Sequence, residues 1–164
     1  YDEAVAIAHS KFSTADKEPL FSLVYKPDWH EGVIGIVASK LVETFKTPAL
    51  VFADASDEGV IKASIRSAGT LNIFECLNSC KDLFIKFGGH KAAAGLSMKK
   101  ENLPALEEHL NNYLQDVPEV IRVNSRRVDI GLSPEEVTPH FAKTLEKLGP
   151  FSIGNEVPIF KIRE

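Results

Sequence analysis

Residues 49–67, ALVFADASDEGVIKASIRS, decide the fold. The first five residues form a continuous apolar run, which predicts a strand buried on both faces. The segment DASDEG (54–59) is rich in turn-forming residues, and VIKASIRS (60–67) then alternates apolar with polar side chains. Alternation with a period of two is typical of a strand with one buried face. We therefore expect two neighbouring strands joined as a hairpin.

Helices are predicted on both sides of this hairpin. FSLVY (21–25) predicts a strand, and GVIGIVASKLVETF (32–45) predicts a helix that ends before a proline. After the hairpin, helices are expected over IFECLNSCKDLF (73–84) and over the amphipathic stretch ENLPALEEHLNNYLQDV (101–117). Strands that alternate with helices in this way indicate an α/β fold with a mixed β-sheet flanked by helices.

VIKASIRS also carries a candidate binding group. Lys62, Ser64 and Arg66 fall on one side of the predicted strand, opposite its apolar residues. Two cations and a hydroxyl in a row suit a phosphate, because Arg presents a planar fork of donors and Ser a short hydroxyl. The alternative is an ordinary half-exposed strand whose outer face is polar.

A second candidate is FGGHKAAAG (87–95), in which two glycines precede a histidine and a run of small residues follows. We expect FGGH to form a loop and AAAGLSM (92–98) to begin as helix and end as strand. Glycines let a backbone approach a ligand closely, and successive N–H groups can bind an anion. His90 would then donate a hydrogen bond to a phosphate oxygen. The alternative is a tightly packed connection in which His90 is buried and satisfied.

The third candidate is WHEGVIGIVASKLVE, at the start of the predicted helix. His30 and Glu31 are candidates for catalysis. We favour a structural role, in which His30 and Trp29 brace the turn from strand to helix while Gly32 and Gly35 allow close packing.

No metal centre is expected from this chain alone. Asp54, Asp57 and Glu58 lie together in a predicted turn, but the sequence has no DHH triplet, HxH, HExxH, Walker or GxSxG motif. Cys76 and Cys80, four residues apart on a predicted helix, are expected to be small buried residues, which favours a reducing cytoplasm.

Charge is unevenly distributed along the chain. The formal net charge is −4, yet residues 62–99 contain six cations and two acids, a local charge of 6 − 2 = +4. A basic segment in an acidic chain can be an anion site, or only a solvated lysine-rich surface. No apolar run reaches membrane-spanning length and no signal-peptide pattern occurs.

A boundary is predicted at Val117-Pro118. Beyond it, 120–132 is predicted to be strand, 133–149 to be one helix begun by a Ser-Pro pair, and 150–162 to be a turn entering a strand that lacks its partner. Because the chain begins with Tyr1, we expect a piece of a longer protein, with tag removal or processing as the alternative.

The three segments WHEGVIGIVASKLVE, KASIRS and FGGHKAAAGLSM occur together and in order, and they closely resemble the DHHA1 domain of the RecJ family of single-strand-specific exonucleases, in the DHH/DHHA1 phosphoesterase superfamily. The tail LEKLGPFSIGNEVPIF resembles the entry into the OB-like domain of that family. The resemblance implies three parts: the end of an interdomain connector helix at 1–14, a DHHA1 domain at 15–118, and a truncated start of the OB-like domain at 119–164.

The resemblance also implies a function. RecJ-like enzymes degrade single-stranded DNA from its 5′ end in DNA repair and recombination, using Mn²⁺ or Mg²⁺ held by an N-terminal DHH domain. This chain would be the half that binds substrate, without catalytic or metal-binding residues of its own. Ser64 and Arg66 would bind the 5′ phosphate, while Gly88, Gly89 and His90 would lie at the cleft, with His90 near the scissile phosphate.

The implied partners are single-stranded DNA with a 5′ phosphate, the DHH domain of the same parent chain and single-strand-binding protein, in the cytoplasm and without a membrane. Two residues depart from the family pattern: Ala63 and Ser152 stand where glycine is common. GGH loops also occur in small-nucleotide phosphoesterases and in relatives of alanyl-tRNA synthetase. Two alternatives therefore remain, the DHHA1 half of a small-nucleotide or oligonucleotide phosphoesterase, and a module that docks a protein partner through 119–164.

Overall fold

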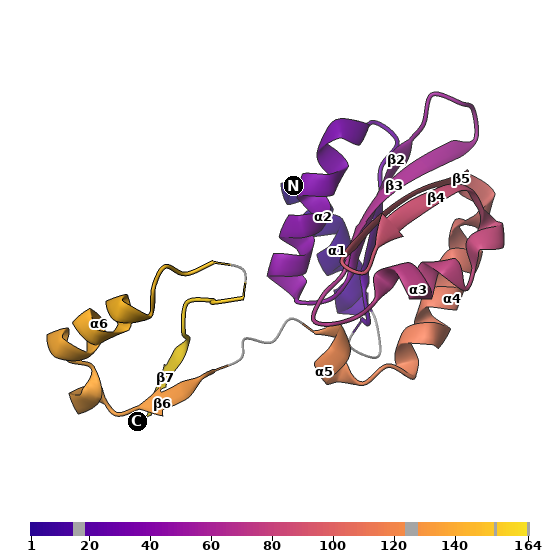
Figure 1. The fold of residues 1–164 in the computed structure, drawn as a ribbon. Coiled ribbons are helices and arrows are strands. Elements are labelled where there is room, and N and C mark those ends of the chain that lie inside the picture. Colours follow the sequence, from indigo (N-terminus) through magenta and orange to yellow (C-terminus); the bar gives the residue numbers. More distant parts are fainter. Residues whose placement is uncertain (15–18, 124–127, 153, 164) are drawn as a thin grey trace. The chain divides into compact units, whose positions relative to one another are not determined.

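The structure is a computed structural model that describes residues 1–14, 19–123, 128–152 and 154–163. The chain divides into two compact units, Tyr1–Ser125 and Arg126–Glu164 (Figure 1). Within the described residues, no helix is long and apolar enough to cross a membrane.

A five-stranded mixed sheet forms the centre of the first unit. Its strands follow the order β1-β2-β3-β5-β4, with β1 parallel to β2 and the other neighbours antiparallel. The strands are β1 (Ser22–Tyr25), β2 (Ala49–Asp54), β3 (Val60–Arg66), β4 (Phe84–His90) and β5 (Ala93–Lys99). The predicted hairpin is confirmed, because β2 and β3 pair from Ala49 opposite Arg66 to Asp54 opposite Ile61.

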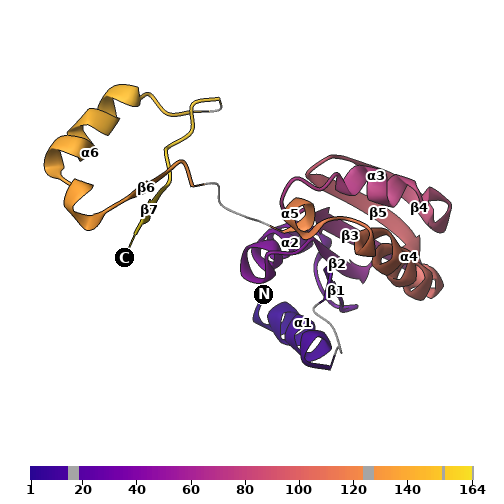
Figure 2. The ribbon, with the colours of Figure 1, turned by 90° about the horizontal axis from the view of Figure 1, so that it is seen from below.

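Helices cover both faces of this sheet (Figures 1 and 2). The helices are α1 (Asp2–Thr14), α2 (Glu31–Phe45), α3 (Ile73–Asn78), α4 (Leu103–Gln115) and α5 (Glu119–Arg122). Buried side chains of α1 and α2 pack with Val51 on one face of the sheet; they include Ala8, Ile34 and Leu41. This arrangement confirms the predicted α/β class with a mixed sheet flanked by helices.

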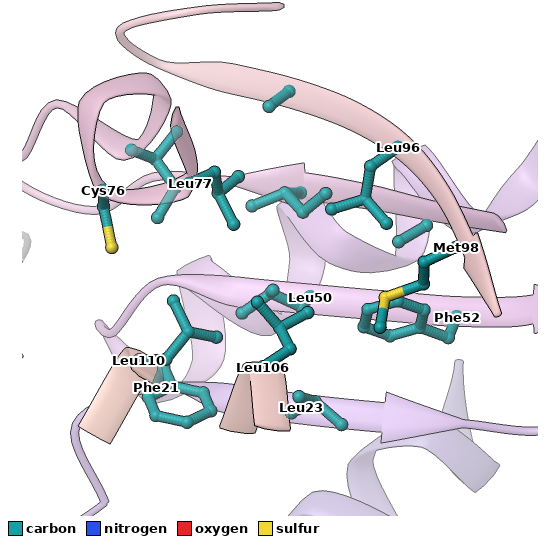
Figure 3. Packing of buried hydrophobic residues seen from close by; sticks show 14 of the residues in the cluster. Phe21, Leu23, Leu50, Phe52, Cys76, Leu77, Leu96, Met98, Leu106 and Leu110 are labelled. Atoms are coloured by element: carbon teal, nitrogen blue, oxygen red, sulfur yellow. The ribbon is translucent and has the colours of Figure 1, made fainter. Parts of the chain in front are cut away.

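The opposite face of the sheet holds the larger core (Figure 3). Leu50 and Phe52 of β2 pack there against Leu77 of α3 and against Leu106 and Leu110 of α4. All five side chains are fully buried. Burying a large apolar side chain contributes about 1.5–3 kcal/mol, so these contacts hold α3 and α4 on the sheet.

Two predictions for the segment around FGGH were wrong. FGGH is the end of strand β4 rather than a loop, and AAAGLSM is strand from Ala93 onward rather than partly helix. β5 pairs with β3 on one side and β4 on the other, and it buries Ala94 and Leu96. The pairing with β3, which is distant in the chain, and the hairpin with β4 together outweigh the local helix preference of the alanines.

The helix predicted over 73–84 is also shorter than expected. It ends at Asn78, and a short 3₁₀ turn at Lys81–Leu83 leads into β4. Phe84 belongs to β4, where its ring lies 5.5 Å from that of Phe87. Packing of the two rings places Phe84 in the sheet, which the helical pattern did not indicate.

The second unit contains strands β6 (Ile130–Leu132) and β7 (Phe160–Ile162), which pair in parallel, and the helix α6 (Pro139–Leu145). The prediction that the last strand lacks a partner was therefore wrong. The rings of Phe141 and Phe160 meet edge to face at 5.3 Å. Of the hydrophobic side chains described beyond residue 127, Leu132 is the one that is buried.

Two further predictions for this region need correction. The single helix expected over 133–149 is broken, because Pro139 has no N–H and Thr138 caps a new helix by accepting a hydrogen bond from the Phe141 N–H. The strand expected over 120–132 is limited to β6, while residues 120–122 lie in α5. The remainder of that prediction includes 124–127, which lie outside the described residues.

Candidate functional site

A cleft of about 510 Å³ opens on the face of the sheet that carries α2. Its walls come from the first turns of α2 and from strands β3, β5 and β4, which lie side by side in the sheet (Figure 1). α2 packs over β2 and β3, so the cleft lies where the helical cover ends and the surface of β5 and β4 begins.

Strand register arranges the residues of this face in three rows across β3, β5 and β4. The lysine row is Lys62, Ser97 and Lys86; the glycine row is Ser64, Gly95 and Gly88; the arginine row is Arg66, Ala93 and His90. Successive rows are two residues apart along each strand, roughly 7 Å, so all three present side chains to the same face. The lysine and glycine rows line the cleft throughout.

Gly88 and Gly95 leave the floor of the cleft without side chains. A Cβ added at Gly88 would meet nothing within 4 Å, and one at Gly95 would meet only the Ala63 carbonyl oxygen at 3.7 Å. Neither glycine has a φ in the left-handed region. The fold therefore does not require glycine at these two positions, whereas a ligand that approaches the backbone would.

Ser64 lines the cleft, and Arg66, two residues further along β3 and outside that lining, is hydrogen-bonded to Ser64. Arg66 Nη1 donates to Ser64 Oγ at 3.0 Å and to the Ile65 carbonyl oxygen at 2.9 Å. Among the described residues, Arg66 has no carboxylate partner, and its Nε and Nη2 make no hydrogen bond. The guanidinium is thus oriented by its neighbours while donors remain for an anion.

Gly35 of α2 makes room for this pair. A Cβ at Gly35 would lie 3.1 Å from Ser64 Oγ and 3.2 Å from Arg66 Nη2, closer than most side chains tolerate. The expectation that glycine here allows close packing is confirmed. The packing it allows is between α2 and the polar side chains of β3, so the helix positions Ser64 and Arg66.

Lys62 has an acidic partner at the start of α2. Its Nζ donates to Glu31 Oε2, and this hydrogen bond, followed by the charge of Lys62, lowers the pKa of the Glu31 carboxyl below 4.5. Lys86, by contrast, is exposed and makes no ion pair within the described residues. The lysine row therefore keeps a net positive charge after Glu31 is counted.

His90 lies at the end of β4, beside a two-residue turn. Its Nδ1 accepts a hydrogen bond from the Ala92 N–H at 3.3 Å, so the neutral ring carries its proton on Nε2. The side chain is exposed, which contradicts the alternative of a buried histidine. The turn is fixed from outside, because the Ser67 and Ile73 N–H groups donate to the carbonyl oxygens of Ala92 and Lys91.

Gly89 differs from Gly88, its neighbour in the motif. Its φ is +154°, and an added Cβ would come within 2.5 Å of the Ala93 carbonyl oxygen and of Ala94 Cα. Glycine is needed here so that β4 and β5 can approach each other. Gly89 therefore shapes the hairpin, and it does not line the cleft.

The residues around the start of α2 make contacts that stabilise the turn from β1 into the helix. His30 is the N-cap, and its Nδ1 accepts a hydrogen bond from the Gly32 N–H at 3.0 Å. Trp29 Nε1 donates to Glu3 Oε2 at 3.1 Å, and Lys26 Nζ bonds the other oxygen of that carboxylate at 2.8 Å. These contacts confirm the structural interpretation of His30 and Trp29, which brace the turn against α1.

Metal ligands and reactive thiols do not gather at the cleft. Within the described residues, no three His, Cys, Asp or Glu side chains come together in a group that could hold a metal ion. Burial raises the pKa of the Cys76 thiol to about 12 and that of Cys80 to about 11, so both thiols stay protonated at neutral pH.

The structure brings Ser64, Arg66 and Gly88 together on one face and adds His90 at its end. The sequence analysis missed Lys86 and Ser97 as members of the same face. Their positions follow from period-two alternation once FGGH is known to be strand, because Lys86 is two residues before Gly88 and Ser97 two after Gly95. Treating FGGH as a loop concealed that signal.

Comparison with known proteins adds independent information. The DHHA1 domain family matches residues 17–116. The single-stranded-DNA-specific exonuclease RecJ of Bacillus subtilis is 37% identical over 137 residues, covering 83% of this chain and 17% of that protein. The Escherichia coli protein of the same name is 32% identical over 163 residues, covering 96% of this chain and 28% of its own length.

A solved structure is also similar to this chain. The crystal structure of RecJ in complex with Mn²⁺ from Thermus thermophilus shares 30% sequence identity, with a TM-score of 0.73. The match covers 96% of this chain and 23% of the Thermus chain. The chain thus spans less than a third of the length of each of these three relatives.

Proposed function

The chain belongs to the DHHA1 domain family, and on that premise we propose that it is the substrate-binding part of a RecJ-type exonuclease that degrades single-stranded DNA from its 5′ end in repair and recombination. Similarity to RecJ over 96% of the chain supports this assignment. In this proposal the cleft holds the end of the strand, and hydrolysis takes place on a companion domain.

The open floor of the cleft is the main structural support for this proposal. Gly88 and Gly95 leave the backbone open beside the pair of Ser64 and Arg66, whose remaining donors have no partner among the described residues. A terminal phosphate is compact, carries negative charge and accepts several hydrogen bonds, so it fits a guanidinium next to a hydroxyl. Its nucleoside would then lie over the glycines, with His90 Nε2 available as a further donor.

Binding of a labelled single-stranded oligonucleotide with a 5′ phosphate, compared with its 5′-hydroxyl twin at low salt, tests this function. We expect the phosphorylated strand to bind more tightly. Arg66→Ala should weaken its binding by roughly 1.5–3 kcal/mol, the range for a hydrogen bond to a charged group, and should abolish the preference. Binding should also fall as salt rises, because phosphate contacts release counterions.

Lys81→Ala is the matched control, because Lys81 is exposed on the 3₁₀ turn before β4 and does not line the cleft. It removes one positive charge and should leave the preference for the 5′ phosphate intact. Equal binding of the two oligonucleotides by the unaltered chain would contradict the assignment of the clamp to Ser64 and Arg66.

In this proposal the catalytic metal is bound by another domain of the parent protein. The described residues do not form a metal site, so Mn²⁺ or Mg²⁺ would be held by a DHH domain of the parent protein, where it would activate water for hydrolysis. The role of this chain is to bind and orient the strand. Adding Mn²⁺ to the chain alone should therefore produce no cleavage.

The remaining parts of the proposal concern cellular context. We propose that the protein acts in the cytoplasm, and that single-strand-binding protein is a further partner because both would act on the same strands. A pulldown of single-strand-binding protein that survives Arg66→Ala would separate this contact from substrate binding. Dependence of that pulldown on residues 119–164 would locate it in the C-terminal part of the chain.

A further inference from the structure

We propose that the lysine row contacts the base of the 5′-terminal nucleotide, and that it favours a base with a carbonyl oxygen on its outer edge over a base with an amino group there. The proposal deepens the proposed function and rests on it, because it takes the positions of the 5′ phosphate and the scissile phosphate from that function. It makes Lys86 a specificity-determining residue of the cleft.

The two phosphates that flank the terminal nucleoside indicate where its base lies. The 5′ phosphate is assigned to Ser64 and Arg66 and the scissile phosphate to the neighbourhood of His90, and Arg66 and His90 belong to the same row. The DNA backbone would therefore cross the sheet from β3 towards β4. The lysine row lies on the other side of the glycine row, so a base that projects sideways from this backbone extends along the strands towards it.

The cleft lies on the same side. It is lined by the lysine and glycine rows, whereas Arg66, Ala93 and His90 of the arginine row do not line it. The hollow part of this face is thus beside the assigned path of the DNA backbone, at the place where a base would project. A group larger than a phosphate is needed to fill it.

The shape and lining of the cleft suit a planar ring. Its volume of about 510 Å³ is within the usual range of sites for small organic ligands. The floor at Gly88 and Gly95 has no side chains, and the wall from α2 includes Gly32 and the aliphatic side chain of Ile34. A base could lie flat against this open backbone and pack its edge on the helix.

The polar groups of the lysine row differ in what they offer to a base. Lys86 is exposed and makes no ion pair within the described residues, and its ammonium group can only donate hydrogen bonds. Ser97 is 8% exposed, and its hydroxyl can donate or accept. Lys62 is bonded to the Glu31 carboxylate, so that pair presents both a donor and an acceptor. Lys86 is therefore the member of the row that discriminates between bases.

A donor without an acceptor favours one class of base. Thymine and guanine carry a carbonyl oxygen on the edge away from the sugar, whereas cytosine and adenine carry an amino group there. The Lys86 ammonium gains a charge-assisted hydrogen bond from a carbonyl oxygen. Beside an amino group it faces a second donor, and neither group is satisfied.

Two 5′-phosphorylated oligonucleotides that differ only in their terminal base test the proposal on the full chain. One begins with uracil and the other with cytosine, which have an oxygen and an amino group, respectively, at the same ring position. We expect the uracil strand to bind about two- to fivefold more tightly, the range for one exposed contact to a charged group. Lys86→Ala should abolish this preference, and Lys86→Arg should retain it, because arginine also has only donors.

Lys81→Ala is the control, because Lys81 is exposed but does not line the cleft, and it should leave the preference unchanged. Equal binding of the two strands by the unaltered chain, or tighter binding of the cytosine strand, would overturn the proposal. A preference that survives Lys86→Ala would also overturn it, even if both strands then bind more weakly, because Lys86 would act through its charge alone.

Arg66→Ala separates this result from the proposed function. It should weaken both strands to the same extent and leave the preference for uracil in place. Unchanged binding of both strands by Arg66→Ala would contradict the terminal clamp. A preference for uracil that disappears in Lys86→Ala would still support the contact between the lysine row and the base.

Discussion

At the scale of single residues, the two adjacent glycines of the FGGH motif differ in whether the fold requires glycine at their position. Gly88 has open space where a side chain would be, whereas Gly89 has a φ of +154° and backbone atoms of β5 within 2.5 Å of an added Cβ. Gly89 is therefore needed for folding, whereas no contact among the described residues requires glycine at position 88.

Alanine substitutions at positions 88 and 89 test this difference through their effects on stability. Gly88→Ala should change the free energy of unfolding by less than about 1 kcal/mol, because its Cβ meets no neighbour. Gly89→Ala should lower the free energy of unfolding by roughly 1–3 kcal/mol, since the chain must keep a strained backbone there. Urea unfolding followed by Trp29 fluorescence measures both.

The same pair of variants is informative for binding. Gly88→Ala should weaken the 5′-phosphorylated oligonucleotide although the protein remains folded. A Gly88→Ala chain with unchanged stability and unchanged affinity would show that the ligand does not approach β4 at this point.

At the scale of elements, the strand–helix turn before α2 connects fold and site. His30 caps the helix through the Gly32 N–H, and a Cβ at Gly32 would lie only 3.0 Å from His30 Nδ1. The cap fixes where α2 begins, and therefore where Glu31 meets Lys62 and where Gly35 covers Ser64. A histidine that looks catalytic in the sequence thus acts through the helix it starts.

Replacing this cap tests its role. His30→Ala should lower the free energy of unfolding by about 1 kcal/mol, the usual effect of losing an N-cap acceptor, whereas His30→Asn should retain most of the stability. Thermal unfolding of the three proteins gives the comparison. If His30→Asn kept full stability but lost oligonucleotide binding, the imidazole itself would have to contact the ligand.

Prediction from the sequence succeeded for elements whose pattern is local. The alternation of VIKASIRS placed Lys62, Ser64 and Arg66 on one face, and the strand appears with that burial pattern. It failed for FGGH and AAAGLSM, because glycine and alanine carry little strand signal by themselves. β4 pairs with β5 across a two-residue turn, and β5 is held in the sheet by β3, whose residues lie about 30 positions away and are not visible in either segment alone.

At the scale of the whole molecule, the two units differ in how much they bury. The first has cores on both faces of its sheet, while the second buries only Leu132 among its described hydrophobic residues. Side chains such as Ile130, Val137 and Val157 are exposed there. Burial of apolar surface is the main favourable term in folding, so the described part of the second unit is held together more weakly than the first unit.

Core substitutions in each unit check this contrast. The single tryptophan, Trp29, belongs to the first unit, so its fluorescence reports on that unit. Leu50→Ala removes a fully buried side chain and should destabilise the transition seen by Trp29 by about 2–5 kcal/mol. Leu132→Ala should leave that transition nearly unchanged. A comparable shift in both variants would mean that the two units unfold as one.

The strand order has a consequence for synthesis. β5 is the last strand of the sheet to be made, yet it lies between β3 and β4 and supplies the middle residue of each row. A ribosome delivers the chain from its N-terminus, and β4 is the edge strand whose neighbour is β5, so the sheet ends at β3 until β5 has been made. The cleft therefore cannot form until residue 99 has left the exit tunnel, and a chain that stops at residue 92 would lack the part of the cleft floor that Gly95, Leu96 and Ser97 supply.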